Sequence, residues 1–235
     1  MRVSRMQQWI ETTNKYVQFS QVDWEQVGNA TKETLYMTFA AAGAVFLMGL
    51  LLGLLLYSTQ GKRSGDGKIL YKVVSALVNV FRSIPFLVLI ILLIPFTKLL
   101  IKKITGPTAA LPALVLSAAP FYARLVETSF REIDKGVIEA AESMGASKRQ
   151  LVSKVLIPES LPGLIAGITV TTISLVGYTA MAGVIGAGGL GNLAYLIGFQ
   201  RNRPTVTLVA TVVILIIVFL IQWIGDLAVK AVDKR

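Results

Sequence analysis

Long apolar runs separated by short polar stretches dominate the chain. Five of these runs reach or exceed the roughly 17 to 25 residues that an α-helix needs to cross the hydrocarbon core of a bilayer. They cover residues 34–57, 73–101, 108–125, 161–184 and 206–229. The second run contains Pro85 and Pro95, which bend a membrane helix where neighbouring groups satisfy the freed carbonyls. The pattern predicts an all-α membrane protein with about five transmembrane helices, the second of them kinked.

The segment 1–33 precedes the first run and is more polar. It carries aromatic side chains such as Trp9 and Trp24, a type that settles at the membrane–water interface. Asp23, followed three residues later by Gln26, has the pattern of a helix N-cap. We therefore predict an N-terminal segment, 1–33, with an interfacial helix. A segment without fixed structure is the alternative.

The basic residues set the expected orientation, because Lys and Arg are enriched on the cytoplasmic side of a membrane protein. With the first and third connections and the C-terminus inside, 13 Lys and Arg side chains lie in the cytoplasm and nine lie outside. The N-terminus and segment 1–33 are therefore expected outside, and the C-terminus in the cytoplasm. Arg82 lies well inside a run, so its guanidinium either contacts a protein group or extends to the headgroups.

The composition excludes several classes of protein. Charged residues make up 15% of the chain, against about 25% in soluble domains, and the mean hydropathy is +0.67. These values exclude an ordinary soluble enzyme. The chain contains neither Cys nor His, which excludes thiolate and imidazole metal sites, disulfides and catalysis by either group. The formal net charge is +10, but the cations flank apolar runs and do not line one surface, so no nucleic-acid partner is expected.

Carboxylates are missing from most of the apolar sequence: Asp and Glu are absent from residues 34–65, 67–126 and 160–225. Ion-coupled transporters generally bind the coupling ion through acidic side chains or His at membrane depth. The chain also lacks the Gly-x-x-x-x-Gly-Lys-Ser/Thr loop that cradles nucleotide phosphates. Uphill transport would therefore need energy from a partner. An ion-coupled secondary transporter and a passive channel are the alternatives.

Residues 186–191 read Gly-Ala-Gly-Gly-Leu-Gly and match the G-x-G-x-x-G pattern of dinucleotide sites. Such a site requires a β-strand before the glycines and an acidic residue about 20 positions after the motif. Here an apolar run precedes the glycines, and the next acid is Asp226. We interpret the segment as flexible backbone beside a membrane helix, as expected where a pathway is lined or gated.

The polar connection at about 127–160 predicts two helices joined by a tight turn. Asp134 can cap a helix over 135–144, and Gly145 suits the left-handed conformation that ends a helix. Ser147 and Gln150 form a capping-box pattern, which opens a second helix that we expect to end at Pro158.

The first of these helices is amphipathic. Its apolar face carries Val137, Ala140, Ala141 and Met144, and its polar face carries Glu139, Glu142 and Ser143. Small side chains on a short exposed helix allow it to dock closely in a groove of a partner. A surface loop that rests on the headgroups is the alternative.

Several pieces of this loop match a known pattern. Together, Glu139-Ala140-Ala141, Gly145 and the end Val155-Leu156-Ile157-Pro158 closely resemble the EAA loop of bacterial ABC-importer permeases. The family prefers Ile at the position of Val155 and Leu at that of Ile157, and both departures are conservative. Segments 34–38, 82–86 and 222–226 extend the similarity, so the chain resembles the five-helix permeases of methionine importers.

This resemblance implies an ABC permease domain over 34–235, with the coupling loop at about 127–160. It implies a multi-pass protein of the bacterial inner or plasma membrane that imports an amino acid, methionine, and is not itself an enzyme. The solute would pass between two copies of the chain, each docked on a separate cytoplasmic ABC ATPase dimer. That ATPase would bind ATP and Mg, so no cofactor or metal is expected on this chain. Its other partners would be membrane lipids and an extracytoplasmic substrate-binding protein.

The resemblance also assigns roles to residues of two segments. The residues that couple to the ATPase would be Glu139, Ala140, Ala141, Gly145 and Pro158. Of these, Glu139 would anchor the helix, the two alanines would permit close approach, and Gly145 would permit the turn. The residues of the pathway would be Gly177, Tyr178 and Met181, on a helix that faces the two-fold axis. Met181 would narrow the path, since a flexible thioether suits a seal that opens. Ordinary helix packing is the alternative for Met181.

Overall fold

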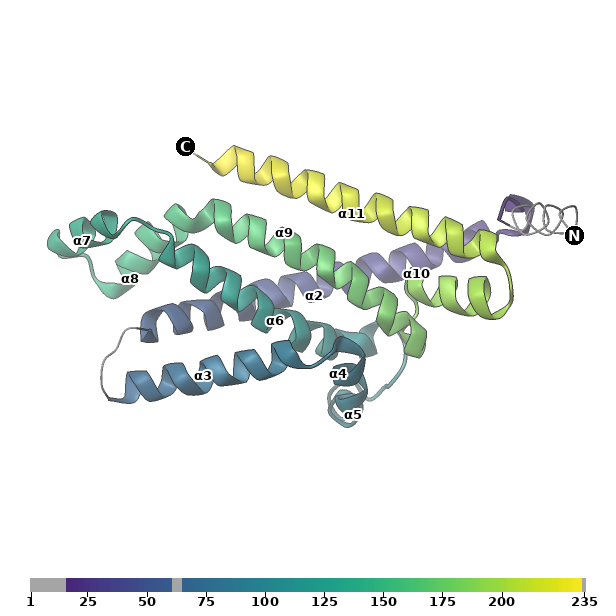
Figure 1. Cartoon of the computed structure of the whole chain (residues 1–235), viewed down its shortest axis with the longest axis horizontal. Helices are drawn as coiled ribbons and strands as arrows, with labels where there is room; N and C mark the ends of the chain where they lie inside the picture. Colours follow the sequence, from purple (N-terminus) through teal and green to yellow (C-terminus); the bar gives the residue numbers. More distant parts are fainter. Residues whose placement is uncertain (1–15, 61–64, 234–235) are drawn as a thin grey trace, which may run out of the picture. The chain divides into compact units, whose positions relative to one another are not determined.

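The computed structural model describes residues 16–60 and 65–233, and every regular element in these two ranges is a helix (Figure 1). In order, the elements are η1 Phe19–Gln21, α2 Trp24–Thr59, α3 Asp66–Ser83, α4 Phe86–Leu92, α5 Ile94–Ile101, α6 Pro107–Arg131, α7 Lys135–Ser143, α8 Lys148–Gln150, η2 Leu151–Leu156, α9 Ile157–Ala182, η3 Gly183–Ala187, α10 Gly189–Asn192, η4 Leu193–Gln200 and α11 Pro204–Val232. Within these two ranges, four helical stretches are long and apolar enough to cross a membrane, and the bent pair α3 and α4 makes a fifth when counted as one span. The all-α class and the number of spans are therefore confirmed.

The first spanning helix begins earlier than the apolar run does. The Asp23 Oδ1 accepts hydrogen bonds from the backbone N–H groups of Glu25 and Gln26, each at 3.1 Å, so Asp23 is the N-cap of α2. From Trp24 on, the predicted N-terminal segment is thus helical and continuous with the first spanning helix. Residues 1–15, the rest of that segment, lie outside the described residues.

The second run is broken, not merely kinked. The helix α3 ends at Ser83, Ile84 is extended (φ −80°, ψ 123°), and α4 leaves at 106° to α3. The cause is Pro85, which disfavours helical backbone in the residue before it. A second interruption lies beside Pro95: α4 ends at Leu92, and Pro95 lies in the first turn of α5, where its missing N–H leaves no carbonyl unpaired.

The helix after the coupling loop is longer than predicted. Instead of ending at Pro158, the helical stretch continues from Lys148 to Ala187 and contains both the second arm of the loop and the fourth span. The six residues Leu151–Leu156 form a π-helical turn directly before Pro158. Wider turns of this kind accommodate a ring that would otherwise clash with the carbonyl four residues earlier.

The chain forms two compact units, each with its own core. The first contains residues 86–114 and 175–219 with the chain up to residue 40; the second contains 41–85, 115–174 and the chain from residue 220 on. In the second unit, glycines let helices approach closely: a Cβ at Gly49 would lie 2.6 Å from Cδ1 of Tyr122, and one at Gly163 would lie 2.7 Å from Oγ of Ser129.

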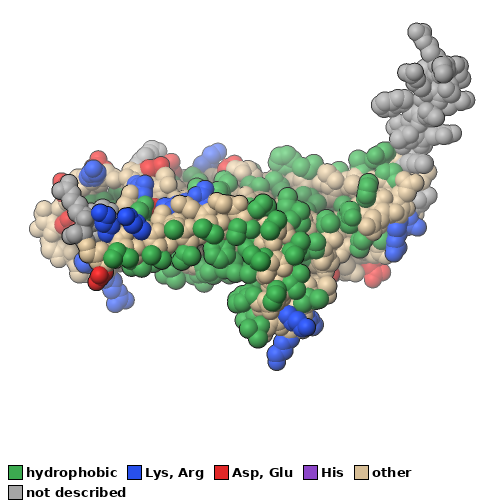
Figure 2. Space-filling model, turned by 60° about the horizontal axis from the view of Figure 1, so that its bottom comes forward, with side chains coloured by type: hydrophobic (Ala, Val, Ile, Leu, Met, Phe, Trp, Pro, Cys, Tyr) green, Lys and Arg blue, Asp and Glu red, His purple; other side chains and the backbone are tan. Residues whose placement is uncertain are grey.

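Much of the molecular surface is apolar. Figure 2 shows hydrophobic side chains spread over much of one face, with few charges among them. The exposed large apolar residues include Leu215, Phe219 and Leu220 of α11 and Phe39 and Leu47 of α2. An apolar surface of this extent fits helices whose surroundings are lipid.

Candidate functional site

The helix α7 at the tip of the connection between α6 and α9 is fixed at both ends. At its start, the Asp134 Oδ1 accepts the N–H of Gly136 at 2.6 Å. At its end, the N–H of Gly145 bonds to the carbonyl of Glu142 at 2.9 Å, and that of Ala146 bonds to the carbonyl of Ala141 at 3.1 Å. These two bonds form a Schellman motif, which requires the positive φ of 82° found at Gly145. The predicted cap residues are confirmed, and α7 is a short rigid body.

The second arm of the loop begins with the predicted capping box. The side chain of Gln150 accepts the Ser147 N–H at 2.8 Å, and the Ser147 Oγ accepts the Gln150 N–H at 3.4 Å. From there the chain passes through α8 and η2 into α9 without interruption. The second arm of the loop and the fourth span are therefore parts of one continuous helical stretch.

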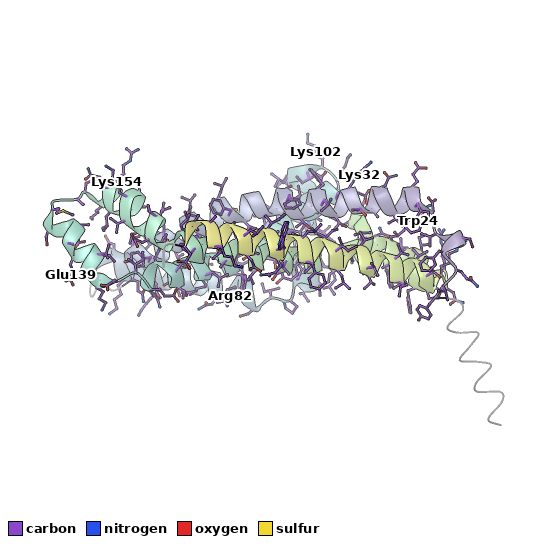
Figure 3. All side chains as sticks on the ribbon, turned by 90° about the horizontal axis from the view of Figure 1, so that it is seen from above. Trp24, Lys32, Arg82, Lys102, Glu139 and Lys154 are labelled. Atoms are coloured by element: carbon purple, nitrogen blue, oxygen red, sulfur yellow. The ribbon has the colours of Figure 1, made fainter. Side chains whose placement is uncertain are left out.

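The loop presents most of its apolar face outward. Val137 and Ala140 are exposed, and Met144 is 82% exposed, so these side chains have little contact within the chain. Glu139 is exposed as well, and Figure 3 shows it on α7, with Lys154 on the following arm. Ala141 differs, since it is only 7% exposed. A larger side chain at Ala141 would disturb the loop itself, whereas one at Ala140 would meet whatever docks on it.

Pro158 lies at the base of the loop, near Val137. It lines an open cavity of about 330 Å³ together with Asp134 and Val137 from the start of the loop and Val232 from the end of α11. Four carboxylate residues line the cavity: Glu132, Asp134, Glu159 and Asp233. Pro158 thus helps to shape the base of the loop.

A buried carboxylate at this base was missed by the sequence analysis. Glu127 is 2% exposed, and its two oxygens accept bonds from Arg124 Nη1, at 2.7 Å, and from Arg131 Nη2. The spacing of three and four residues is a helical ion-pair signal. It was overlooked because the third span was ended at residue 125, whereas α6 runs to Arg131. The spanning helices therefore do contain carboxylates, and in Glu127 both oxygens are paired with guanidinium groups.

Glu127, Arg124 and Arg131 form a charged cluster, and Arg124 links this cluster to α3. Its Nη2 donates to the Ser75 carbonyl at 3.3 Å, to Ser75 Oγ, and to the Asn79 Oδ1 at 3.0 Å. From the same helix, the Tyr71 hydroxyl donates to Glu127 at 3.5 Å. The cluster ties α3 to the last turns of α6, immediately before the loop. It can hold the loop's base rigid, but it has no free oxygen for a coupling ion.

The predicted pathway residues lie together near the end of α9. Gly177 and Met181, four residues apart, share one face; Gly177 has open space around it, and Met181 is 45% exposed. Tyr178 is half-buried, and its ring stacks on Phe86 with centroids 4.8 Å apart and planes at 11°. Sequence reasoning missed this role of Phe86, although the residue directly follows the break at Pro85.

The glycine segment forms a turn between two helices. Within η3, Gly186 has a φ of 92°, and Gly188 follows with a φ of 86°. The Gly106 N–H, just before α6, donates to the carbonyl of Gly186 at 2.9 Å. A helix and not a β-strand precedes the glycines, so the dinucleotide interpretation is excluded.

Arg82 lies in the last turn of α3, before the break. Its guanidinium carbon is 5.9 Å from the centroid of the Phe121 ring. This cation–π distance places the charge against protein, which is the first of the two predicted alternatives.

Comparison with known proteins shows which family has this arrangement. Residues 46–235, which include the loop and the pathway segment, match the model of the binding-protein-dependent transport system inner membrane component. The chain belongs to this family. It is therefore a multi-pass membrane protein and a subunit of a transport system, as the resemblance of the EAA loop implied.

Relatives of known name are similar over nearly their whole length. The chain is 60% identical over 217 residues to the methionine import system permease protein MetP of Bacillus subtilis, covering 92% of this chain and 98% of that protein. It is 46% identical to the probable D-methionine transport system permease protein MetI of Pasteurella multocida, covering 90% and 98%. Its structure is similar to that of a chain of the inward-facing MetNI methionine ABC transporter, with a TM-score of 0.87, 45% identity and coverage of 90% and 98%.

Proposed function

We propose that this chain is the permease subunit of an ATP-driven methionine importer. The observation that carries the proposal is the 60% identity to a methionine import permease over 92% of the chain. The outward apolar face of α7 supports a docked partner, and the paired state of Glu127 disfavours a coupling ion as the energy source.

In this proposal two copies of the chain form the pathway, and each docks on a separate ATPase that binds ATP and Mg. Closure of the ATPase pair moves α7, which is capped at both ends and transmits the movement as a rigid lever. Because one helical stretch joins residues 148 and 187, that movement reaches Met181 through continuous backbone. Nucleotide binding then shifts a two-state equilibrium between inward and outward opening.

Individual residues have distinct parts in this mechanism. Glu139 and Ala140 contact the ATPase, Ala141 permits close packing of the loop on itself, and Gly145 supplies the turn. Pro158 shapes the base of the loop. Gly177 and Met181 line the pathway on their shared open face, and Tyr178 is held beside them by its stacking on Phe86.

The proposal retains the predicted topology. The N-terminus lies outside, on the side where an extracytoplasmic substrate-binding protein delivers the solute. The C-terminus and the coupling loop lie in the cytoplasm, on the side of the ATPase.

Purification from the native membrane tests this assembly. The chain should purify with a stoichiometric ABC ATPase, two copies of each per complex, and the complex should hydrolyse ATP. A chain that purifies without any ATPase, and that conducts methionine in liposomes by itself, would identify a passive channel instead.

A further inference from the structure

Two consecutive side chains of α2 hold the glycine turn that follows α9. The Glu33 Oε2 accepts the backbone N–H of Gly189 at 2.6 Å, and the Thr34 Oγ1 accepts that of Leu190 at 2.9 Å. Gly189 and Leu190 are the first two residues of α10, and they lie 156 residues further along the chain. We refer to Glu33, Thr34 and these two N–H groups as the clasp.

The turn cannot make these hydrogen bonds by itself. The first N–H groups of a helix have no partner within the helix, and the N-cap position here is Gly188, which has no side chain. Glu33 and Thr34 fill that role from another helix, and a carboxylate suits the positive end of the helix dipole. The glycines leave room for them, since a Cβ at Gly188 would lie 2.5 Å from the Glu33 Oε2 and one at Gly189 would lie 2.8 Å from the Thr34 Oγ1.

The clasped turn rests directly on the part of α9 that carries Met181. A Cβ at Gly191 would overlap the backbone of Ala180, and one at Gly183 would overlap the N of Asn192. The start of α10 therefore lies in backbone contact with the residue before Met181. A movement of the turn relative to α2 would therefore displace Ala180 and, with it, Met181.

We infer that Glu33 is a positioning residue of the transport pathway, which it serves by fixing the turn after α9 to α2. This inference rests on the proposed function, because it takes Met181 as part of the pathway. With the clasp intact, Met181 keeps one position while the pathway is closed. Without it, α9 ends in a loose turn, the seal becomes leaky, and ATP is hydrolysed without transport.

Matched variants separate the clasp from the rest of the helix. Glu33→Ala removes the acceptor, whereas Glu33→Gln keeps a carbonyl oxygen that can take the Gly189 N–H. Thr34→Val and Thr34→Ser make the same comparison at the second bond. Glu25→Ala is the control, because Glu25 is an exposed acid on the same helix, outside the clasp.

The experiment uses the complex with its ATPase in proteoliposomes. Methionine uptake, ATP hydrolysis and ATP-independent efflux of preloaded methionine are measured in the same vesicles. Glu33→Ala and Thr34→Val should each raise efflux and the ATP hydrolysed per methionine by about five-fold, the factor that corresponds to one lost hydrogen bond. Glu33→Gln, Thr34→Ser and Glu25→Ala should stay near wild type. Unchanged efflux and stoichiometry in both Glu33→Ala and Thr34→Val would overturn the inference.

A second measurement does not depend on the substrate. Amide hydrogen exchange of a peptide that covers 183–192 should be faster in Glu33→Ala and Thr34→Val than in wild type or Glu25→Ala. Wild-type exchange in both variants would overturn the clasp even if transport failed. Conversely, a wild-type complex that does not accumulate methionine would refute the proposed function, while faster exchange in the variants would still support the clasp. If Glu33→Ala does not assemble, Thr34→Val decides both readouts, since it removes the other acceptor of the clasp and nearly keeps the shape of the side chain.

Discussion

At the scale of single residues, Glu127 shows how the base of the coupling loop is held. A carboxylate that is 2% exposed is tolerated in a membrane protein because two guanidinium groups compensate its charge. The two partners are not equivalent: the Arg124 side chain is 20% exposed and reaches Ser75 and Asn79 of α3, whereas Arg131 is 43% exposed. The carboxylate and Arg124 therefore hold the two helices together, and Arg131 contributes less.

The loss of stability caused by substitutions in this cluster should follow the same order. Glu127→Gln leaves both arginines without their counter-ion and should destabilise the protein by about 3 kcal/mol, at the low end for a broken buried pair. Arg131→Gln should lower the free energy of unfolding by at most about 1 kcal/mol, the range measured for exposed ion pairs. Melting temperatures of the detergent-solubilised protein test the order, with Glu132→Gln, an exposed neighbour, as control. Equal effects of Glu127→Gln and Arg131→Gln would contradict the burial argument.

Met181 offers a second test at this scale. Its exposed side chain has little packing to lose within the chain, so Met181→Ala should leave the amount of assembled complex unchanged and raise the ATP-independent leak of methionine. Leu208→Ala, an exposed apolar residue of α11, provides the control for a general effect of truncation. If Met181→Ala changes neither leak nor uptake, Met181 does not narrow the pathway.

At the scale of elements, the loop was the part most fully predicted from sequence. Its caps at Asp134, Gly145 and Ser147 depend on neighbours within five residues, so they can be identified without knowledge of the rest of the fold. Two prolines show the limit of such reasoning. Pro85 breaks a helix, whereas Pro158 is accommodated because a π-helical turn precedes it. No local sequence signal predicts that turn, so the different outcomes at the two prolines were not foreseen.

Contacts between residues distant in sequence were also not predictable, because no local sequence pattern signals them. The sequence analysis identified the glycine turn but not Glu33, which lies 156 residues before its partner. It identified Tyr178 but not Phe86, and it placed Glu127 outside the spans because apolar runs, and not helix ends, defined them. Local patterns thus predict helices and caps, whereas side-chain partners require the fold.

The prediction at the scale of elements concerns Gly145, the glycine that ends α7. Gly145→Val forces a β-branched side chain into a backbone with φ of 82°, at a cost of about 1 to 2 kcal/mol, and should abolish co-purification of the ATPase and methionine uptake. Gly145→Asn should retain much of both, since Asn tolerates the left-handed conformation. The two variants are compared at equal amounts in the membrane. Wild-type binding and uptake in Gly145→Val would remove the coupling role of this turn.

At the scale of the whole molecule, the proposed function requires a connection between the loop and the proposed pathway residues. Each of α2, α6, α9 and α11 contributes residues to both compact units. A stretch from 148 to 187 contains the second arm of the loop and Met181. Family membership places this architecture in a binding-protein-dependent transport system, and in the proposed function the loop is where the ATPase acts on it.

The most direct test of this account is methionine accumulation in proteoliposomes that contain the permease with its ATPase and substrate-binding protein. ATP supplied on the ATPase side should drive methionine uptake against its gradient, and a protonophore should not reduce that uptake while ATP is maintained. Uptake that collapses with the protonophore, or accumulation by the permease alone, would contradict the account.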